Sequence, residues 1–340
     1  MSRAALVMMV AAVVAGLTLL ELDRRWRTPL AIPAGGLHFT VEDGDTLGRV
    51  VARLRSQNIA PHPTLILAYG RWSGLDEKIK RGEYLLPQYL TNESLLMRLS
   101  RGEVIRHSLT FPEGISLAQA LQILSREESL EQLLDGAGDP RIIALVAPYA
   151  WGEGLFFPDS YQYERGDSDW QILQRAYGRM AVILEEEWTA RDAALPYDSS
   201  YEALIMASII EKETGQAEER AEIAGVFVRR LQRGMRLQTD PTVIYGLGEQ
   251  FQGNLRRADL ANSDNLFNTY RHNGLPPSPI ALPGREAIHA ALHPDEGDTL
   301  FFVATGDGSH VFSSTLKEHE KAVRKYQLKR RADYRSSPKR

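Results

Sequence analysis

An uninterrupted apolar segment opens the chain, from Ala4 to Leu20, with no charged residue and no proline. As an α-helix it would be about 26 Å long, slightly less than the roughly 30 Å of a membrane hydrocarbon core. Arg3 and Trp26 lie at its two ends, where the interface favours such side chains. A cleaved signal peptide would need a small-x-small site after the apolar run, and the following residues offer none. We therefore predict an uncleaved transmembrane anchor over residues 1–27.

The charges that flank this segment do not by themselves support export. Arg3 lies on one side and Arg24, Arg25 and Arg27 on the other, so the basic excess of cytoplasmic flanks would place the body inside the cell. Two acidic residues within the second cluster weaken that signal. Because the flanking charges leave the orientation open, we infer it from the class of substrate that the later motifs indicate.

Strand and helix patterns alternate in residues 37–100. An alternating strand around Phe39 leads through a DG turn into a helix opened by Asp45 or Thr46, and a second helix and a closing strand at residues 79–87 follow. This order, with the string FTVEDGDTL, resembles the LysM module, a glycan-binding fold. The alternative is a small α+β packing domain with a common turn sequence.

The rest of the chain predicts two further segments and a tail. Residues 101–150 form a connecting α+β segment, in which a strand, a PEG turn and a helix follow one another. A change of composition at Trp151 opens a mixed α+β domain over residues 151–328 with a loop-rich cleft, and residues 329–340 form a basic tail that we expect to be disordered. The fold class is thus α+β: one N-terminal transmembrane helix, a LysM-like subdomain and this larger domain.

Within residues 151–328 the pattern predicts helices and one hairpin. The helices cover residues 169–192, 201–215, 218–234 and 285–294, with glycine caps at Gly215 and Gly234, and a further helix begins at Leu316. A GDG turn between two apolar runs predicts the hairpin at residues 299–312. Residues 151–166 show neither the helical nor the strand period of apolar residues, and residues 235–248 are predicted to be loop.

Composition removes several function classes. The formal charge of −4 gives no basic field to attract phosphates, so nucleic acid is not an expected partner. The chain has no cysteine, which excludes disulfides and thiolate chemistry. His289 and His293 have the i, i+4 spacing of a zinc helix, but neither a glutamate after the first histidine nor a third ligand nearby in sequence accompanies them. The sequence has no GxSxG string and no phosphate-binding glycine loop, so a serine nucleophile and nucleotide binding lack support. We expect neither a metal nor any other cofactor.

Two glutamates stand out at the end of the very apolar helix that contains the string IIEKETG. Glu211 and Glu213 are two residues apart, so they point roughly 200° apart on a helix and only one can face a given cleft. We expect one to be solvated and the other to lie over apolar surroundings, where burial raises the pKa as a general acid requires. The spacing alone favours the alternative, a charged helix end with two surface glutamates.

Several long strings resemble the endolytic murein transglycosylases, the MltG or YceG-like family. They are EGLFFPDSY, ASIIEKETG, GVFVRRLQRGMRLQTDPTVIYGLG, NTY followed by GLPPSPIALPG, and FVATGDGSHVFSSTLKEH. The family also has one N-terminal span and a LysM-like domain, so the resemblance covers nearly the whole chain. It implies cleavage of nascent peptidoglycan strands between N-acetylmuramic acid and N-acetylglucosamine, leaving a 1,6-anhydromuramic end.

The same resemblance implies the catalytic residue. The functional glutamate of the motif falls on Glu213, and Glu211 is the fallback if the register differs. A glycosidase that hydrolyses needs two carboxyls, whereas here the C6 hydroxyl of the sugar attacks, so one glutamate can act as acid and then as base.

Polar and aromatic residues in the matched strings are the candidates for binding substrate: Glu153, Asp159, Gln238, Asp240, Thr242, Tyr245, Asn268 and Tyr270. For each, a structural role in capping a loop or forming a turn is the alternative. The expected partners are peptidoglycan glycan strands and the bacterial inner membrane, with the body on the periplasmic side, and cell-wall synthases or division proteins as candidate protein partners. The rival function is a non-catalytic, membrane-anchored glycan-binding scaffold of cell-wall synthesis.

Overall fold

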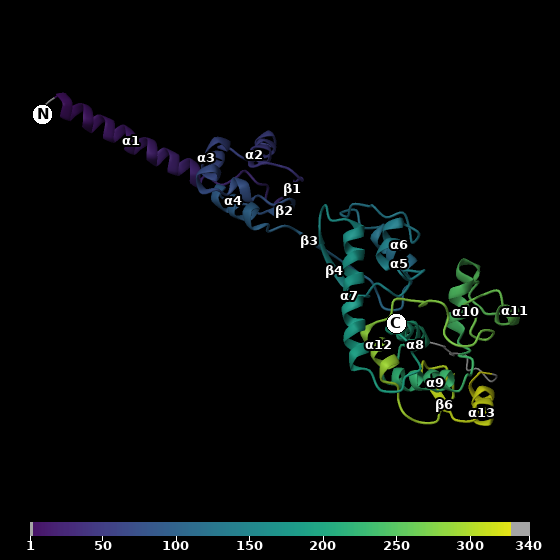
Figure 1. Ribbon diagram of the computed structural model, residues 1–340. Coiled ribbons are helices and arrows are strands. Elements are labelled where there is room, and N and C mark those ends of the chain that lie inside the picture. The colour runs from purple at the N-terminus through teal and green to yellow at the C-terminus, as the bar shows by residue number, and fades with distance from the viewer. Residues whose placement is uncertain (1–2, 328–340) are drawn as a thin grey trace. The chain divides into compact units, whose positions relative to one another are not determined.

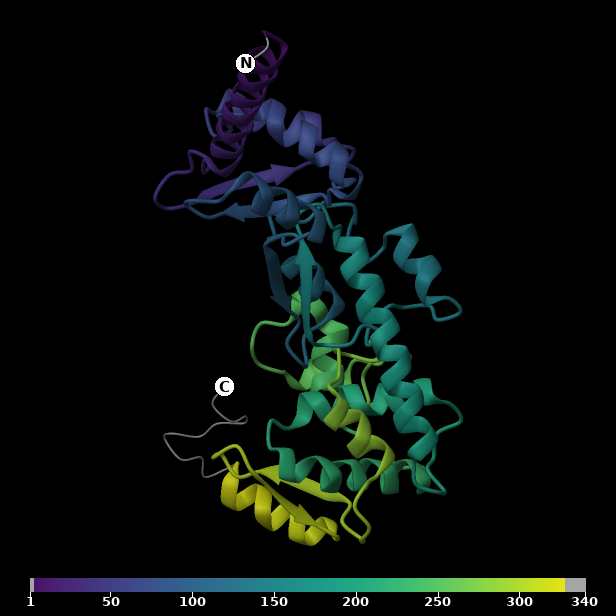
Figure 2. The same ribbon diagram turned by 90° about the vertical axis from the view of Figure 1, so that its left-hand side faces the viewer.

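The computed structural model describes residues 3–327 (Figures 1 and 2). The chain forms two compact units, each with its own core. Unit 1 runs to His107 and includes Gln162–Asp167, and unit 2 comprises Ser108–Tyr161 and the chain from Ser168 onward. Most of the segment that we expected to be a connection, residues 108–150, therefore folds within unit 2. The predicted tail at residues 329–340 lies outside the described residues.

Unit 1 begins with α1, Arg3–Arg27, which Figure 1 shows as one continuous helix. None of its residues is buried, and it is long and apolar enough to cross a membrane. The helix that the apolar run predicts is thus present.

The rest of unit 1 has the predicted order of strand, two helices and strand. The elements are β1 (Leu37–Val41), α2 (Leu47–Ser56), α3 (Pro63–Ser73), a short 3-10 turn η1 (Asp76–Lys78), β2 (Gly82–Leu86) and α4 (Asn92–Arg101). The strands β1 and β2 pair antiparallel, with Phe39 opposite Tyr84, and these two side chains belong to the core. Thr46 is the N-cap of α2, since its hydroxyl accepts from the amide of Arg49.

A pair of strands carries the chain from one unit to the other. These strands are β3 (Arg106–Thr110) and β4 (Ser160–Glu164), which form a two-stranded sheet. The second strand lies in a segment that showed no period in the sequence, and that interpretation was wrong. Tyr161 and Tyr163 alternate with exposed residues, but a strand of five residues is too short for the period to stand out.

Unit 2 is mainly helical. Its helices are α5 (Leu117–Leu124), α6 (Pro140–Val146), α7 (Asp169–Ala190), α8 (Ser200–Glu213), α9 (Arg220–Gln232), α10 (Asp240–Leu247), α11 (Arg257–Ala261), α12 (Arg285–Leu292) and α13 (Leu316–Tyr326), with 3-10 turns η2 (Ala217–Glu219) and η3 (Gly248–Gln250). The predicted hairpin is β5 (Phe301–Ala304) paired with β6 (His310–Ser313), and α13 packs on it (Figure 2).

Helix α8 is the centre of unit 2. It packs against α7, α9, α10 and α12, and every residue from Ala203 to Ile210 is buried. Helices on several sides explain why its apolar residues cover the whole circumference rather than one stripe. The charged end EKE is therefore held rigidly at the rim of the core.

Two predicted helix features need correction. Helix α8 ends at Glu213 with Thr214 as an extended C-cap, not at Gly215. The segment at residues 240–247, which we read as loop, is helix α10, because Pro241 lies in the first turn, where its missing N–H costs nothing. Gly234 does have the expected left-handed conformation after α9, with φ of 64°.

Candidate active site

The C-terminal end of α8 brings the two glutamates of the IIEKETG string to different neighbours. Glu211 faces the start of α12, where its Oε2 accepts from the amide of Gly284 at 3.2 Å. Glu213 faces the start of α10, where its Oε1 accepts a hydrogen bond from the hydroxyl of Thr239. The divergence that the helix period predicts is present. The expectation that one glutamate is solvated was wrong, since neither side chain is fully exposed.

Glu213 has the properties of a general acid. Its pKa is raised to about 7, chiefly because the surrounding protein removes water from the carboxylate, and also because Asp240 is negative. The hydrogen bond from Thr239 and the charge of Arg230 act in the opposite direction. Part of the residue nevertheless remains accessible. A carboxyl of this kind is about half protonated at neutral pH, so it can both give and take a proton.

Thr239 is itself held by two buried threonines. Its amide donates to Thr269 Oγ1 at 3.1 Å, and its carbonyl accepts from Thr242 Oγ1 at 2.8 Å. The hydroxyls of Thr242 and Thr269 lie 2.9 Å apart. Thr242 is fully buried, so this candidate for substrate binding positions the group that contacts Glu213. Sequence reasoning did not single out Thr239 or Thr269, although each lies between two residues that it did name.

Asp240 and Tyr270 form a pair beside Glu213. The Tyr270 hydroxyl donates to Asp240 Oδ1 at 2.7 Å. Burial and the charge of Asp240 raise the pKa of Tyr270, to which Glu213 also contributes. Asp240 is exposed and Tyr270 is partly exposed, so the pair lies at the accessible side of the carboxyl.

Gln238 has a strained backbone and an exposed side chain. Its φ of 54° lies in the left-handed region, and its amide donates to the carbonyl of Thr269 at 3.2 Å. A non-glycine residue in this region costs free energy and marks positions that the surrounding structure fixes. Within residues 3–327 no protein group hydrogen-bonds the Gln238 side-chain amide, which leaves it available to a ligand.

Asn268 has a structural environment. Its amide nitrogen donates to the carbonyls of Asp259, Leu260 and Asn262, at 3.1, 3.2 and 2.7 Å. Its amide oxygen accepts from the backbone of Tyr270 at 3.0 Å. Being fully buried, it holds the loop that carries Tyr270.

Glu153 and Tyr245 form a second polar pair at the other end of α10. The Tyr245 hydroxyl donates to Glu153 Oε2 at 3.0 Å, and Glu153 Oε1 accepts from the amide of Leu117 at 2.9 Å. Burial raises the pKa of Glu153 to about 7, against the effect of these hydrogen bonds and of Lys212. Its oxygens are thus already used to fix the start of α5.

Asp159 lies apart from these groups. Its Oδ2 is 2.7 Å from Nε of Arg179 on α7, and its Oδ1 accepts from the amide of Ser160 at 2.7 Å. No contact among the described residues links it to Glu213. A surface hollow beside α5 also contains a carboxylate, that of Asp169, but its oxygens accept from the amides of Leu133 and Leu134, so it offers no free acid.

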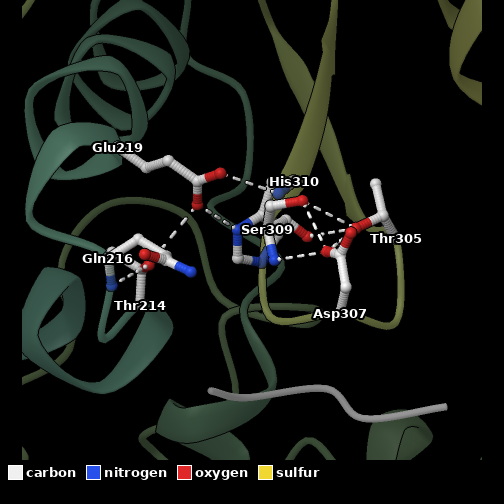
Figure 3. A network of polar contacts seen from close by, with 7 residues as sticks. All are labelled: Thr214, Gln216, Glu219, Thr305, Asp307, Ser309 and His310. Atoms are coloured by element: carbon white, nitrogen blue, oxygen red, sulfur yellow. Dashed lines mark hydrogen bonds and ion pairs between the residues drawn. The ribbon is translucent and has the colours of Figure 1, made fainter. Parts of the chain in front are cut away.

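The turn that follows Glu213 is tied to the hairpin, as Figure 3 shows. The hydroxyl of Thr214 donates to Glu219 Oε2 at 3.4 Å and accepts from the amide of Gln216 at 2.9 Å. Glu219 in turn accepts from the amide of His310 at 2.8 Å and lies 2.7 Å from its Nδ1. This nearly buried histidine therefore anchors the segment after the acid to β6, a role that the sequence did not indicate.

Comparison with known proteins supports the resemblance found in the sequence. The profile of the YceG-like family matches residues 39–325, which is most of the chain. The chain belongs to the YceG-like family. Since the match includes the C-terminal end of α8, both Glu211 and Glu213 lie within it.

Two characterised relatives carry the same name. The chain is 29% identical over 308 residues to an endolytic murein transglycosylase of Bacillus subtilis, covering 85% of this chain and 84% of the relative. It is 27% identical over 317 residues to one of Streptococcus pneumoniae, covering 83% of this chain and 57% of the relative. A crystal structure of a YceG-like protein from Listeria monocytogenes aligns with a TM-score of 0.54 and 28% identity, over 84% of this chain and 99% of that one. This YceG-like chain therefore shares its fold and most of its length with them.

Proposed function

We propose that this YceG-like protein is an endolytic murein transglycosylase with Glu213 as its single acid and base. The observation that carries the proposal is a half-buried carboxyl with a pKa of about 7, held by Thr239 at the end of a rigid helix. Its family membership and the names of its relatives give the substrate class.

The reaction needs one proton to move twice. Neutral Glu213 gives its proton to the oxygen between N-acetylmuramic acid and N-acetylglucosamine, and the bond from that oxygen to the anomeric carbon breaks. The C6 hydroxyl of the same muramic residue then bonds to the anomeric carbon and returns a proton to the Glu213 carboxylate. No water is consumed, and the product ends in a 1,6-anhydro ring. Because Thr239 donates to Oε1, the transferable proton belongs on Oε2.

Glu211 is less suited to this role. Its Oε2 accepts from the amide at the N-terminus of α12, where the helix dipole favours the negative form. Burial and the nearby Glu113 raise its pKa, but its carboxylate is already used to hold the start of α12. We assign it to positioning.

The groups that grip the sugar are those that remain accessible near Glu213. Gln238 offers a free amide, and Asp240 and Tyr270 offer a carboxylate and an aromatic ring. We propose these three as substrate-binding residues. Thr242, Asn268, Glu153 and Tyr245 support the site through bonds inside the protein, and Asp159 has no proposed part in binding.

A comparison of Glu213→Gln with Glu211→Gln tests the assignment. Both exchanges keep the shape of the side chain and remove its proton chemistry. With the full chain in detergent and uncrosslinked glycan strands as substrate, mass spectrometry counts the anhydro ends. We expect Glu213→Gln to lower the rate by about 100-fold or more, and Glu211→Gln to retain most of it. Undiminished anhydro product from Glu213→Gln would show that Glu213 is not the acid, and loss only in Glu211→Gln would move the acid to that residue. Absence of anhydro product from the parent protein itself would favour the glycan-binding scaffold.

The localisation follows from the substrate. We propose that α1 anchors the protein in the bacterial inner membrane with both units on the periplasmic side, where it meets nascent strands and cell-wall synthases or division proteins. The LysM-like order of β1, α2, α3 and β2 suits glycan binding by unit 1. Alkaline phosphatase fused after Arg340 folds only outside the cytoplasm and should be active, and an inactive but intact fusion would contradict export.

A further inference from the structure

A group of metal-binding side chains lies where the C-terminal end of α12 meets α7. One ligand atom each of Glu187, His289 and His293 lies within 4.8 Å of the other two. Nothing in the transglycosylase mechanism uses these residues. The sequence argued against a metal here because no third ligand follows the two histidines. The fold supplies it from 102 residues earlier in the chain, on α7.

The histidine pair is arranged as ligands of one ion would be. The residues are one helical turn apart, and their ring centroids are 4.3 Å apart. Two protonated imidazoles at this distance would repel each other, whereas two neutral ones can both direct a lone pair at one cation. Glu187 is nearly buried, and its Oε2 lies 2.8 Å from Nδ1 of His289.

The second ring nitrogen of His293, Nε2, has an environment that ordinary ion pairing does not explain. Nδ1 of the same ring lies 2.9 Å from Oδ1 of Asp192, so in the neutral ring Nδ1 carries the proton and Nε2 the lone pair. That Nε2 is buried and has no hydrogen-bond partner within residues 3–327. A histidine whose other nitrogen donates to a carboxylate is the usual form of a zinc ligand, because the carboxylate fixes the tautomer and the ring orientation.

The charges around the pair also favour a cation. Arg285 pairs with two carboxylates, those of Glu186 and Glu187, and a third carboxylate, that of Asp192, pairs with His293. Arg285 contacts Oε1 of Glu187 at 2.6 Å and leaves Oε2 on the side of His289. The group therefore keeps a negative excess when both histidines are neutral.

We propose that Glu187, His289 and His293 bind a divalent transition-metal ion, with Zn²⁺ preferred and water in the fourth position. Two imidazoles and one carboxylate are a ligand set that Zn²⁺ takes readily. Ligand atoms around a tetrahedral Zn²⁺ are about 3.3 Å apart, so the three side chains, whose ligand atoms lie within 4.8 Å of one another, must rearrange. The His289 side chain is 55% exposed and can turn to do so. Such an ion joins α7 to the helix whose other end binds Glu211, and it takes no part in the chemistry at Glu213.

Titration with Zn²⁺ alone tests the proposal. The full chain, without a polyhistidine tag, is treated with a chelator in detergent and followed by calorimetry and by its melting temperature. We expect one equivalent of Zn²⁺ to bind saturably and to raise the melting temperature. Tetrahedral absorption bands should appear when Co²⁺ replaces Zn²⁺. Failure to bind Zn²⁺ saturably would overturn the proposal.

Variants locate the ion. His289→Ala, at an exposed position, should abolish saturable binding, and Asp192→Asn should weaken it by about 10-fold, as loss of a hydrogen-bonded partner of a ligand does. His62→Gln removes a histidine from unit 1 and should leave binding unchanged. Because His289 is exposed, its variant should fold, which a circular dichroism spectrum matching that of the parent would check. Full binding retained by a folded His289→Ala protein would contradict the site.

Discussion

The hydrogen bond from Thr239 to Glu213 controls the pH at which the acid is available. Thr239→Val removes the hydroxyl and keeps the size of the side chain. The bond lowers the pKa of Glu213 because it favours the carboxylate. A hydrogen bond to a charged group contributes about 1.5 to 3 kcal/mol, but the neutral carboxyl retains part of it. The difference between the two forms is then on the order of 1.4 kcal/mol, or one pKa unit.

The expected result is a shift of the alkaline limb of the pH profile. The parent has a pKa of about 7 at Glu213, and its reaction begins from the protonated form. At pH ~8 only about a tenth of the parent is protonated, against about half of a variant whose pKa is ~8. The variant should therefore keep roughly five times more of its own maximal kcat/KM at this pH.

The assay is kcat/KM for the formation of anhydro ends across the pH range in which both proteins stay folded. Thr110→Val is the matched control, since Thr110 contacts Ser160 rather than the site, and its profile should coincide with that of the parent. A Thr239→Val profile that also coincides with the parent, or moves toward acid, would refute the reasoning.

Three further predictions follow from the same groups. Asp240→Asn removes a charge that raises the pKa of Glu213, so its alkaline limb should move toward acid, opposite to Thr239→Val; a shift toward alkali in the same assay would be inconsistent with this. In the folded protein the pKa of Glu213 is raised from 4.5 to about 7, so ionisation of the carboxyl lowers the free energy of unfolding as pH rises through that window. Glu213→Gln should remove this loss of stability, which is up to about 3 kcal/mol. In urea unfolding at pH ~8 the variant should therefore be more stable than the parent. Equal stability of the two proteins there would contradict burial of the carboxylate. Gln238→Gly should be more stable than Gln238→Ala by about 1 kcal/mol, because only glycine adopts a left-handed φ freely. Both variants should bind the sugar less well, which would appear as a raised KM. Equal stability of the two variants would show that the backbone strain is absent.

The local pattern predicted most of the elements. The apolar run gave α1, helical spacing gave α2, α7, α9 and α12, and the GDG turn gave the β5–β6 hairpin. These elements follow from interactions between residues close in sequence, so the sequence encodes them directly. Two of the elements that were missed, β4 and α10, are short, and each begins within two residues of a proline, where local signals conflict.

The site could be predicted only in part. The resemblance selected Glu213, and the helical period correctly sent Glu211 to another face. The helical period did not indicate that both carboxyls would be partly buried, because this burial depends on α10 and α12, which come later in the chain. Thr239 and Thr269 were passed over for the same reason, since the amide of Thr239 and the hydroxyl of Thr269, which hydrogen-bond, are 30 residues apart in the chain.

What the sequence determined by itself is the apolar N-terminal helix, most of the other helices and the string that contains Glu211 and Glu213. Only the tertiary structure decided which groups set the properties of Glu213, and which of the named polar residues are buried supports. It also brought Glu187 beside His289 and His293 as a third candidate ligand, because α7 packs on α12. The pKa of a carboxyl and the completeness of a metal site depend on distances between segments remote in sequence, and no local pattern contains those distances.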